Sequence, residues 1–176
     1  MFYVTGDTKA PPLLFCGDTL FAGGCGRFFE GNAQDMLNIL YGTVANLPPE
    51  TLVYCGHEYT LKNLEFALTV EPNNEMLQRR YEAAKKLRNT ERPQPTIPTT
   101  IGAELQTNPF LRVHLPHIAS SLGCYDMNPE EKVTAKGQET AASFVGRHSE
   151  IPDTNSPHSF SLVEVMQQLR KCKDQF

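Results

Sequence analysis

Two segments of the sequence share one pattern, in which an apolar run ends at a glycine and a potential metal ligand follows. "LLFCGD" places Asp18 after Gly17, and "TLVYCGH" places His57 after Gly56. Short apolar runs bounded by glycine are typical of buried strands. Because the carboxyl ends of strands in such sheets converge on a shared edge, we expect the two side chains to lie close together.

Each of the two residues also has a purely structural interpretation. An aspartate after a strand commonly bonds its own backbone in a turn, and a histidine is commonly a hydrogen-bonded core residue. A carboxylate can instead bridge two cations about 3.5–4 Å apart, and an imidazole nitrogen can bind zinc. The parallel placement favours a shared site, although a zinc site needs roughly three or four ligands. The other histidines are weak candidates: His114 and His117 are separated by Pro116, and His148 and His158 lie in a polar stretch.

Several side chains are candidates for binding an anionic or polar ligand. Arg27 follows Asp18 in a glycine-rich loop and can bind an anion, or it can be an ordinary exposed arginine. Arg170 and Lys173 lie near the end of the last predicted helix, where cations also stabilise the helix dipole. Tyr59 either packs against its neighbours or offers its phenol to a ligand.

Composition limits the class of protein. The chain has 176 residues, of which 40% are hydrophobic and 20% charged, a balance typical of one ordinary soluble domain or two small ones. The net charge of −4 argues against a nucleic-acid binder. No apolar run approaches the length of a transmembrane helix, and no signal peptide is evident. Five cysteines without a C-x-x-C motif indicate reduced thiols in a cytosolic protein.

The hydrophobic pattern predicts an α+β fold that divides near residue 72. Strands alternate with helices in residues 1–72, with Asn32 and Thr60 as helix N-caps. Residues 73–176 are predicted to be helical without a strand. A polar, weakly periodic stretch at about 123–160 is expected to be a long loop or a disordered insertion. After it, Ser161 and Glu164 form a capping box for a final amphipathic helix.

Five separated motifs, in the same order, resemble those of one family. They are "GDTLFAGGCGRFFEG", "CGHEYT", "NLEFA" followed by "VEP", "NPFLRV" and the terminal "KCKDQF". Together they resemble glyoxalase II, the hydroxyacylglutathione hydrolases of the metallo-β-lactamase fold superfamily, over roughly residues 1–115 and 160–176. The resemblance implies a partial αββα metallo-β-lactamase-like domain followed by a helical domain that binds the glutathione conjugate. It also implies hydrolysis of the thioester of S-D-lactoylglutathione to D-lactate and glutathione.

The resemblance assigns roles to individual residues. Asp18 would bridge two divalent metals and His57 would hold one of them, with zinc expected and iron or manganese as alternatives. No catalytic residue beyond the metal ligands is implied. The residues that would contact the glutathione part of the substrate are Arg27, where the family commonly has lysine, Tyr59, Arg170 and Lys173.

The sequence also departs from the family pattern. The T-H-x-H-x-D-H motif and a further G-H-T histidine are absent, and Phe29 stands where the family has a tyrosine that contacts glutathione. The chain therefore resembles the second half of the enzyme and is expected to be inactive alone. The full-length protein is expected to be monomeric and cytoplasmic, or to have a mitochondrial form, without nucleic-acid or membrane partners. Two alternatives are a non-catalytic module that binds glutathione conjugates and an iron-dependent persulfide dioxygenase of the same fold, against which "NPFLRV" argues.

Overall fold

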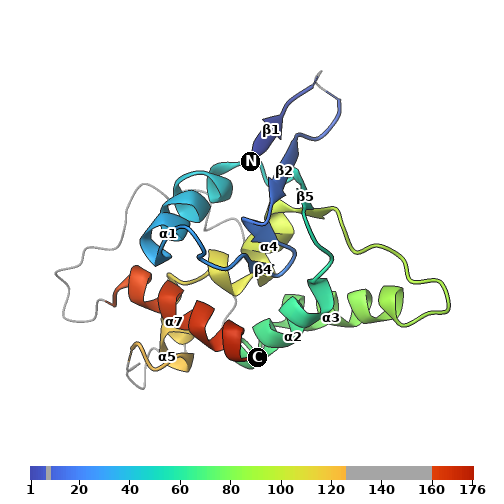
Figure 1. The fold of residues 1–176 in the computed structure, drawn as a ribbon. Coiled ribbons are helices and arrows are strands. Elements are labelled where there is room, and N and C mark those ends of the chain that lie inside the picture. Colours follow the sequence, from blue (N-terminus) through green and yellow to red (C-terminus); the bar gives the residue numbers. More distant parts are fainter. Residues whose placement is uncertain (7–8, 126–159) are drawn as a thin grey trace. The chain divides into compact units, whose positions relative to one another are not determined.

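A computed structural model describes residues 1–6, 9–125 and 160–176 (Figure 1). Almost all of the stretch predicted as an insertion at 123–160 lies outside these residues. Contacts group the chain into two compact units, Met1–Gly26 with Leu47–Pro109, and Arg27–Asn46 with Phe110–Phe176. These units do not test the predicted domains 1–72 and 73–176, which stay a prediction. No helix in the described ranges has the length and apolar character needed to span a bilayer.

The first unit contains a mixed four-stranded sheet in the order β1-β2-β5-β6. β2 and β5 are parallel, whereas the β1–β2 and β5–β6 pairs are antiparallel. This mixture of strands and helices confirms the α+β class. β1, β2 and β5 lie where the sequence predicted strands. β6 corrects the prediction that no strand follows residue 72, because a strand of two residues is too short to show a periodicity. The bounds are β1 Phe2–Val4, β2 Leu13–Gly17, β5 Leu52–Cys55 and β6 Thr99–Thr100.

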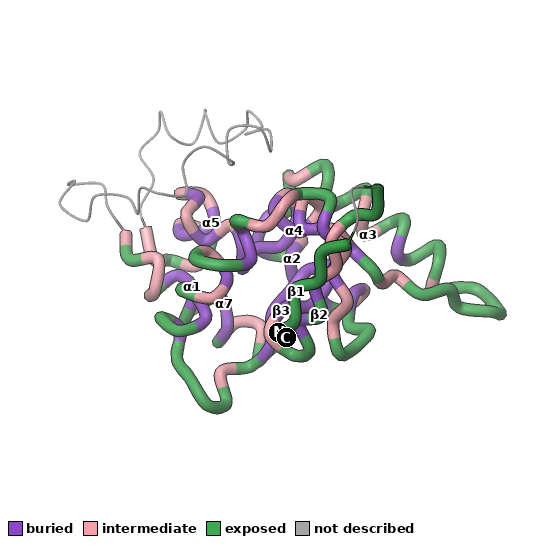
Figure 2. The backbone as a smooth tube through the Cα atoms, turned by 90° about the horizontal axis from the view of Figure 1, so that it is seen from above, coloured by how far each residue is buried: buried purple, intermediate pink, exposed green. Residues whose placement is uncertain are grey.

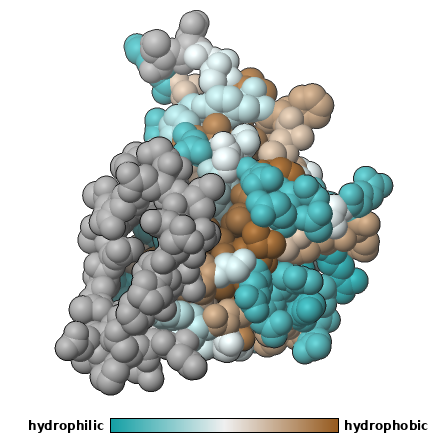
Figure 3. Space-filling view, turned by 90° about the vertical axis from the view of Figure 1, so that its left-hand side faces the viewer, coloured by the Kyte–Doolittle hydropathy of each residue, from teal (hydrophilic) through white to brown (hydrophobic). Residues whose placement is uncertain are grey.

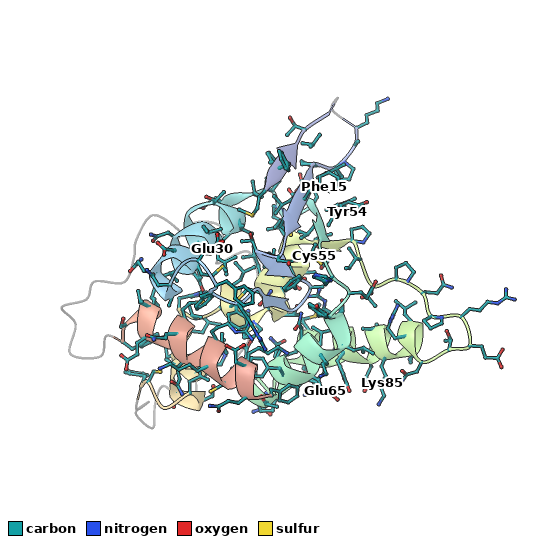
Figure 4. All side chains as sticks on the ribbon, viewed as in Figure 1. Phe15, Glu30, Tyr54, Cys55, Glu65 and Lys85 are labelled. Atoms are coloured by element: carbon teal, nitrogen blue, oxygen red, sulfur yellow. The ribbon has the colours of Figure 1, made fainter. Side chains whose placement is uncertain are left out.

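The two faces of this sheet differ in burial. Leu14 and Val53 pair in register and are 3% and 0% exposed. Phe15 and Tyr54 alternate with them to the opposite face, where their rings stack at 5.3 Å (Figure 4). Phe2 of β1 pairs with Phe15 of β2, and β1 is exposed along its whole length (Figure 2). Apolar side chains therefore remain at the surface, as Figure 3 also shows for the face that it displays.

A small hairpin follows the first strand pair in the chain. β3, Leu20–Phe21, pairs antiparallel with β4, Gly24–Cys25, where the sequence predicted only a loop. Asn63 and Asn108 fasten this hairpin to helices, since their side-chain amides donate to the carbonyl oxygens of Ala22 and Gly24 at 3.1 and 3.0 Å. Such long-range bonds have no signature in the local pattern.

Helices α2, Thr60–Val70, and α3, Glu75–Arg88, pack against each other in the first unit. Glu65 and Lys85, labelled in Figure 4, flank Tyr81, which donates to Glu65 and lies 5.8 Å below the Lys85 ammonium. The buried hydrophobic cluster that joins the two helices consists of Leu64, Ala67, Leu77 and Ala84.

Thr60 is not the N-cap of α2, which corrects the prediction. The N-cap is Tyr59, which makes no side-chain cap bond, and Thr60 is the first helical residue. The Thr60 hydroxyl instead accepts a hydrogen bond from the Thr96 hydroxyl at 2.6 Å. A long-range partner has therefore replaced the local cap that the sequence suggested.

A buried carboxylate holds four elements of the first unit together. Glu104, on α4 (Ile101–Thr107), is 0% exposed and forms a salt bridge with Arg80 of α3. It also accepts hydrogen bonds from the Gly23 amide at 2.8 Å and the Asn108 amide at 2.9 Å. The Thr99 hydroxyl donates to it at 2.8 Å. Because buried charge is costly unless it is fully paired, this network is a strong constraint on the fold.

The second unit is helical in its described residues. Asn32 caps α1 as predicted, in a capping box with Asp35. The Ser161 hydroxyl accepts from the Glu164 amide at 3.3 Å at the start of the final helix, which confirms Ser161 as the N-cap, one half of the predicted capping box. α1 and α7 pack together. The helices are α1 Ala33–Gly42, α5 Pro116–Ser121 and α7 Leu162–Gln175, with short 3-10 turns η1 Val44–Asn46 and η2 Pro109–Leu111.

Candidate functional site

Asp18 and His57 meet at the carboxyl ends of β2 and β5. The distance between His57 Nε2 and Asp18 Oδ1 is 3.6 Å, and the two side chains are 51% and 67% exposed. They are brought together because β2 and β5 are parallel neighbours and both ligands follow the strand ends. The prediction that the repeated pattern places these side chains side by side is confirmed.

Two glycines shape this edge. Gly17 has φ +52°, the left-handed region that glycine adopts readily, and its carbonyl accepts from the Gly56 amide at 2.9 Å. A Cβ on Gly56 would lie 2.4 Å from Asp18 Oδ1. Glycine at position 56 therefore makes room for the carboxylate, which explains why a glycine precedes the histidine.

Replacing Gly56 with alanine should displace the Asp18 carboxylate without unfolding the protein. The atom in the way is the end of an exposed side chain that can rotate, so we expect a small effect on the free energy of unfolding. The affinity for Zn²⁺ should fall about tenfold, as it does when groups that orient metal ligands are changed. A zinc titration followed through the His57 ring signals in NMR measures this. Gly42→Ala is the matched control, because its Cβ meets no atom within 4 Å; equal affinities in both variants would contradict the prediction.

Aromatic rings line one side of the pair. The Tyr59 ring stacks on the His57 ring with centroids 5.0 Å apart and an angle of 19°. Phe21 contacts both rings, at 6.2 Å from His57 and 5.2 Å from Tyr59. Tyr59 thus packs against the histidine, as one of its two interpretations predicted, and remains 49% exposed. That its phenol binds a ligand stays a prediction. Phe21 was not identified from the sequence, where it read as an ordinary apolar residue.

The donor set at this edge suits a divalent metal but is small. Carboxylate oxygen and imidazole nitrogen are both zinc ligands, and their exposure leaves room for further ligands. Within the described residues, however, no group of three or more His, Cys, Asp or Glu side chains is placed to hold an ion. Asp18 and His57 therefore fit two positions of a metal site and do not complete it.

The thiols near the pair are free and protonated. None of the five cysteines, all of which lie in the described residues, forms a disulfide, in agreement with the predicted reduced thiols. Burial is the main cause that raises the pKa of Cys16 to about 12, and burial also raises the pKa of Cys55. The Cys55 thiol donates to the His57 carbonyl at 3.4 Å. These neutral thiols hold the backbone around the site.

Two of the three predicted cations in the second unit share one carboxylate. Arg27 Nε and Arg170 Nη2 lie 3.1 and 3.0 Å from Asp174 Oδ1. Lys173 follows on α7, and its ammonium lies 5.2 Å above the Phe176 ring. The structure thus brings Arg27 and Arg170 together. Asp174 was not identified from the sequence, although its position directly after Lys173 could have marked it as a partner for these cations.

Two further predictions concern single side chains of the second unit. Phe29, in place of the family tyrosine, is 84% exposed. His114 bonds the Tyr41 hydroxyl through Nδ1 at 3.0 Å. This hydrogen bond agrees with the prediction that His114 is a weak candidate for a metal ligand.

The sequence matches the family profile described as the C-terminus of hydroxyacylglutathione hydrolase over residues 58–176. This chain belongs to the hydroxyacylglutathione hydrolase family. The resemblance to glyoxalase II stated from the motifs is thereby confirmed.

Individual relatives of the hydroxyacylglutathione hydrolase family agree with this assignment. The cytoplasmic hydroxyacylglutathione hydrolase of Arabidopsis thaliana is 54% identical over 123 residues, which cover 70% of this chain and 47% of the relative. A probable hydroxyacylglutathione hydrolase of Schistosoma mansoni is 58% identical over 105 residues, covering 60% and 43%. The chain therefore spans about half the length of the curated relatives it matches.

Proposed function

We propose that this chain contributes part of an enzyme that hydrolyses the thioester of S-D-lactoylglutathione to D-lactate and glutathione. The observation that carries the proposal is the Asp18–His57 pair, 3.6 Å apart at adjacent strand ends in a chain of this family. Two relatives named as an established and a probable hydroxyacylglutathione hydrolase are more than half identical to it over the matched residues. The sheet and its flanking helices are proposed to be half of a metallo-β-lactamase-like αββα sandwich.

Asp18 and His57 would hold the metal. Asp18 would be shared by the two ions of a dinuclear centre, and His57 would help to hold one of them. Bound divalent ions would polarise the thioester carbonyl and supply a nucleophile near neutral pH. The oxygen and nitrogen donors suit zinc, with iron and manganese as alternatives. Gly56 keeps the carboxylate in place, and Tyr59 fixes the plane of the imidazole by stacking on it.

The remaining ligands are proposed to come from residues outside these 176. The T-H-x-H-x-D-H motif of the resembled family does not occur in the sequence. The relatives carry roughly as many residues again beyond the matched part, since the chain covers 47% of the Arabidopsis protein. A chain joined to such a segment is proposed to be a cytoplasmic monomer.

The substrate is anionic, and each unit offers groups that suit it. In the first unit, Tyr59 is half exposed and is proposed to contact the substrate through its phenol. In the second unit, Arg27, Arg170 and Lys173 are proposed to attract the glutathione carboxylates, since local cations suit an anionic ligand even on an acidic protein.

A complementation experiment tests this function. The chain is joined to the segment of the Arabidopsis relative that it does not match, and zinc content and lactoylglutathione hydrolysis are measured. We expect bound zinc and turnover in the joined protein, and loss of both in the Asp18→Asn variant. Glu50→Gln is the control, because Glu50 is an exposed acid of the same unit. A joined, folded and zinc-loaded protein that leaves the thioester intact would refute the proposal.

A further inference from the structure

Phe21 touches both of the rings at the candidate site. Its ring centroid lies 5.2 Å from that of Tyr59, at an angle of 71°, and 6.2 Å from that of His57, at 53°. Tyr59 and His57 stack on each other at 5.0 Å, so each ring contacts the other two at a separation typical of attractive ring contacts. Phe21 is only 6% exposed, whereas the other two residues are about half exposed. Phe21 is therefore the buried member of this cluster.

The backbone that carries Phe21 is held by side chains from other elements. The Asn108 amide donates to the Phe21 carbonyl at 3.3 Å. In the turn that follows Phe21, one carbonyl accepts from Asn63 at 3.1 Å and one amide donates to Glu104 at 2.8 Å. All three polar side chains are buried, where a group that loses its partner is costly, so these bonds resist movement of the hairpin. The position of Phe21 is thus fixed independently of the two rings that it touches.

Asn63 also joins this hairpin to α2, the helix that follows Tyr59. Its backbone amide donates to the Tyr59 carbonyl at 2.9 Å, while its side chain donates to the hairpin. A Cβ on Gly23 would lie 2.8 Å from a side-chain carbon of Leu64, so glycine allows the hairpin to lie directly against α2. The hairpin and the start of α2 are therefore held together by contacts other than those of the rings.

We propose that Phe21 is a positioning residue of the candidate site. Its anchored ring keeps the Tyr59 and His57 rings stacked, and it thereby fixes both the imidazole that would bind a metal and the phenol that would meet the substrate. Phe21 acts by packing alone, because its side chain has no polar atom. The inference rests on the proposed function, which supplies the metal and the thioester as ligands of the other two rings.

The physical reason is the conformational freedom of exposed side chains. A half-exposed ring that can turn must be ordered when it binds a ligand, and this ordering weakens binding. A fixed neighbour removes part of that freedom before the ligand arrives. Methionine at position 21 keeps the position apolar and fills much of the same space, but it lacks the rigid ring. It should therefore loosen the stack while the hairpin bonds, which involve only the backbone of residues 21–24, remain.

Side-chain NMR of the metal-free 176-residue chain tests the positioning directly. The χ1 couplings of His57 and the cross-relaxation between the His57 and Tyr59 ring protons report whether the stack is fixed. We expect one dominant His57 rotamer in the unmodified chain, and averaged couplings with loss of the ring-to-ring signals in Phe21→Met. Phe66→Met is the matched control, because Phe66 is 2% exposed and lies about two turns along α2 from Tyr59.

Circular dichroism establishes that each variant is folded. Phe21→Leu, which cannot overfill the position, is a second variant with the same expected result. Averaged His57 couplings in the unmodified chain would overturn the inference, and so would unchanged couplings in a folded variant of Phe21.

A zinc titration at constant pH, followed through the His57 ring signals, tests the consequence for the site. We expect Phe21→Met to bind Zn²⁺ about threefold more weakly than the unmodified chain, the order of effect that ordering one side chain has on binding. Phe66→Met should bind as the unmodified chain does. A merely structural role would lower stability in both variants and leave the affinity of the folded protein unchanged.

The two measurements separate this inference from the proposed function. If zinc moves no His57 signal in the unmodified chain, His57 is not a metal ligand and the proposed function fails, while the metal-free couplings still decide whether Phe21 fixes the ring. If zinc binds the unmodified chain, Phe21→Met and Phe66→Met with equal affinity, the proposed function stands and the inference is overturned.

Discussion

The isolated 176-residue chain should retain only a small fraction of an equivalent of zinc after dialysis and should leave lactoylglutathione intact. The reason is the number of ligands. Asp18 and His57 are two donors, and the described residues contain no group of three, whereas a catalytic zinc ion is held by about three protein ligands. Without a bound ion, the pKa of water stays far above neutral, so that no hydroxide nucleophile is available at neutral pH.

Metal analysis and a thioester assay on the purified chain check this result. The joined protein described above is the positive control, since it has the same residues and the additional ligands. Near-stoichiometric zinc with rapid turnover in the isolated chain would contradict the prediction. It would show that other residues, such as His114 and His117, or a second molecule supply the missing ligands.

Replacing Arg80 with methionine should lower the free energy of unfolding by about 3–5 kcal/mol, the cost of leaving a buried charge without its partner. Glu104 is 0% exposed and forms its salt bridge with Arg80. The Arg80 guanidinium also donates to the Thr99 hydroxyl at 2.9 Å. Removing the cation leaves the Glu104 carboxylate with neutral donors only, so the loss should far exceed that of a surface ion pair.

Urea denaturation followed by circular dichroism measures the effect of Arg80→Met. A low protein concentration is needed, because exposed aromatic side chains such as Phe2, at 77%, favour association. The neighbouring Arg79→Met is the matched control: its side chain is 73% exposed and pairs with Glu75 on the surface, so it should cost at most about 0.5 kcal/mol. Adding Glu104→Gln to Arg80→Met should recover part of the loss. Equal stability of the Arg79 and Arg80 variants would refute the assigned role.

Features encoded by neighbouring residues could be predicted from the sequence. Asn32 caps its helix because a side chain and the amides it accepts from are only a few residues apart. Asp18 and His57 were predicted to converge because each follows a glycine-ended apolar run, and the carboxyl ends of strands meet at a shared edge of a sheet. The family, too, was evident from motifs that are local in sequence.

The tertiary structure alone decided which distant residues become partners. Nothing in the local sequence marks Glu104 as buried, because its burial depends on Arg80, Thr99 and the Gly23 amide, which come from other elements. Asp174 likewise forms an ion pair with Arg27 only because the fold brings that residue from a distant part of the chain. Periodicity records which face of an element is apolar. It does not record which polar group will meet another across the fold, because that depends on how the elements pack.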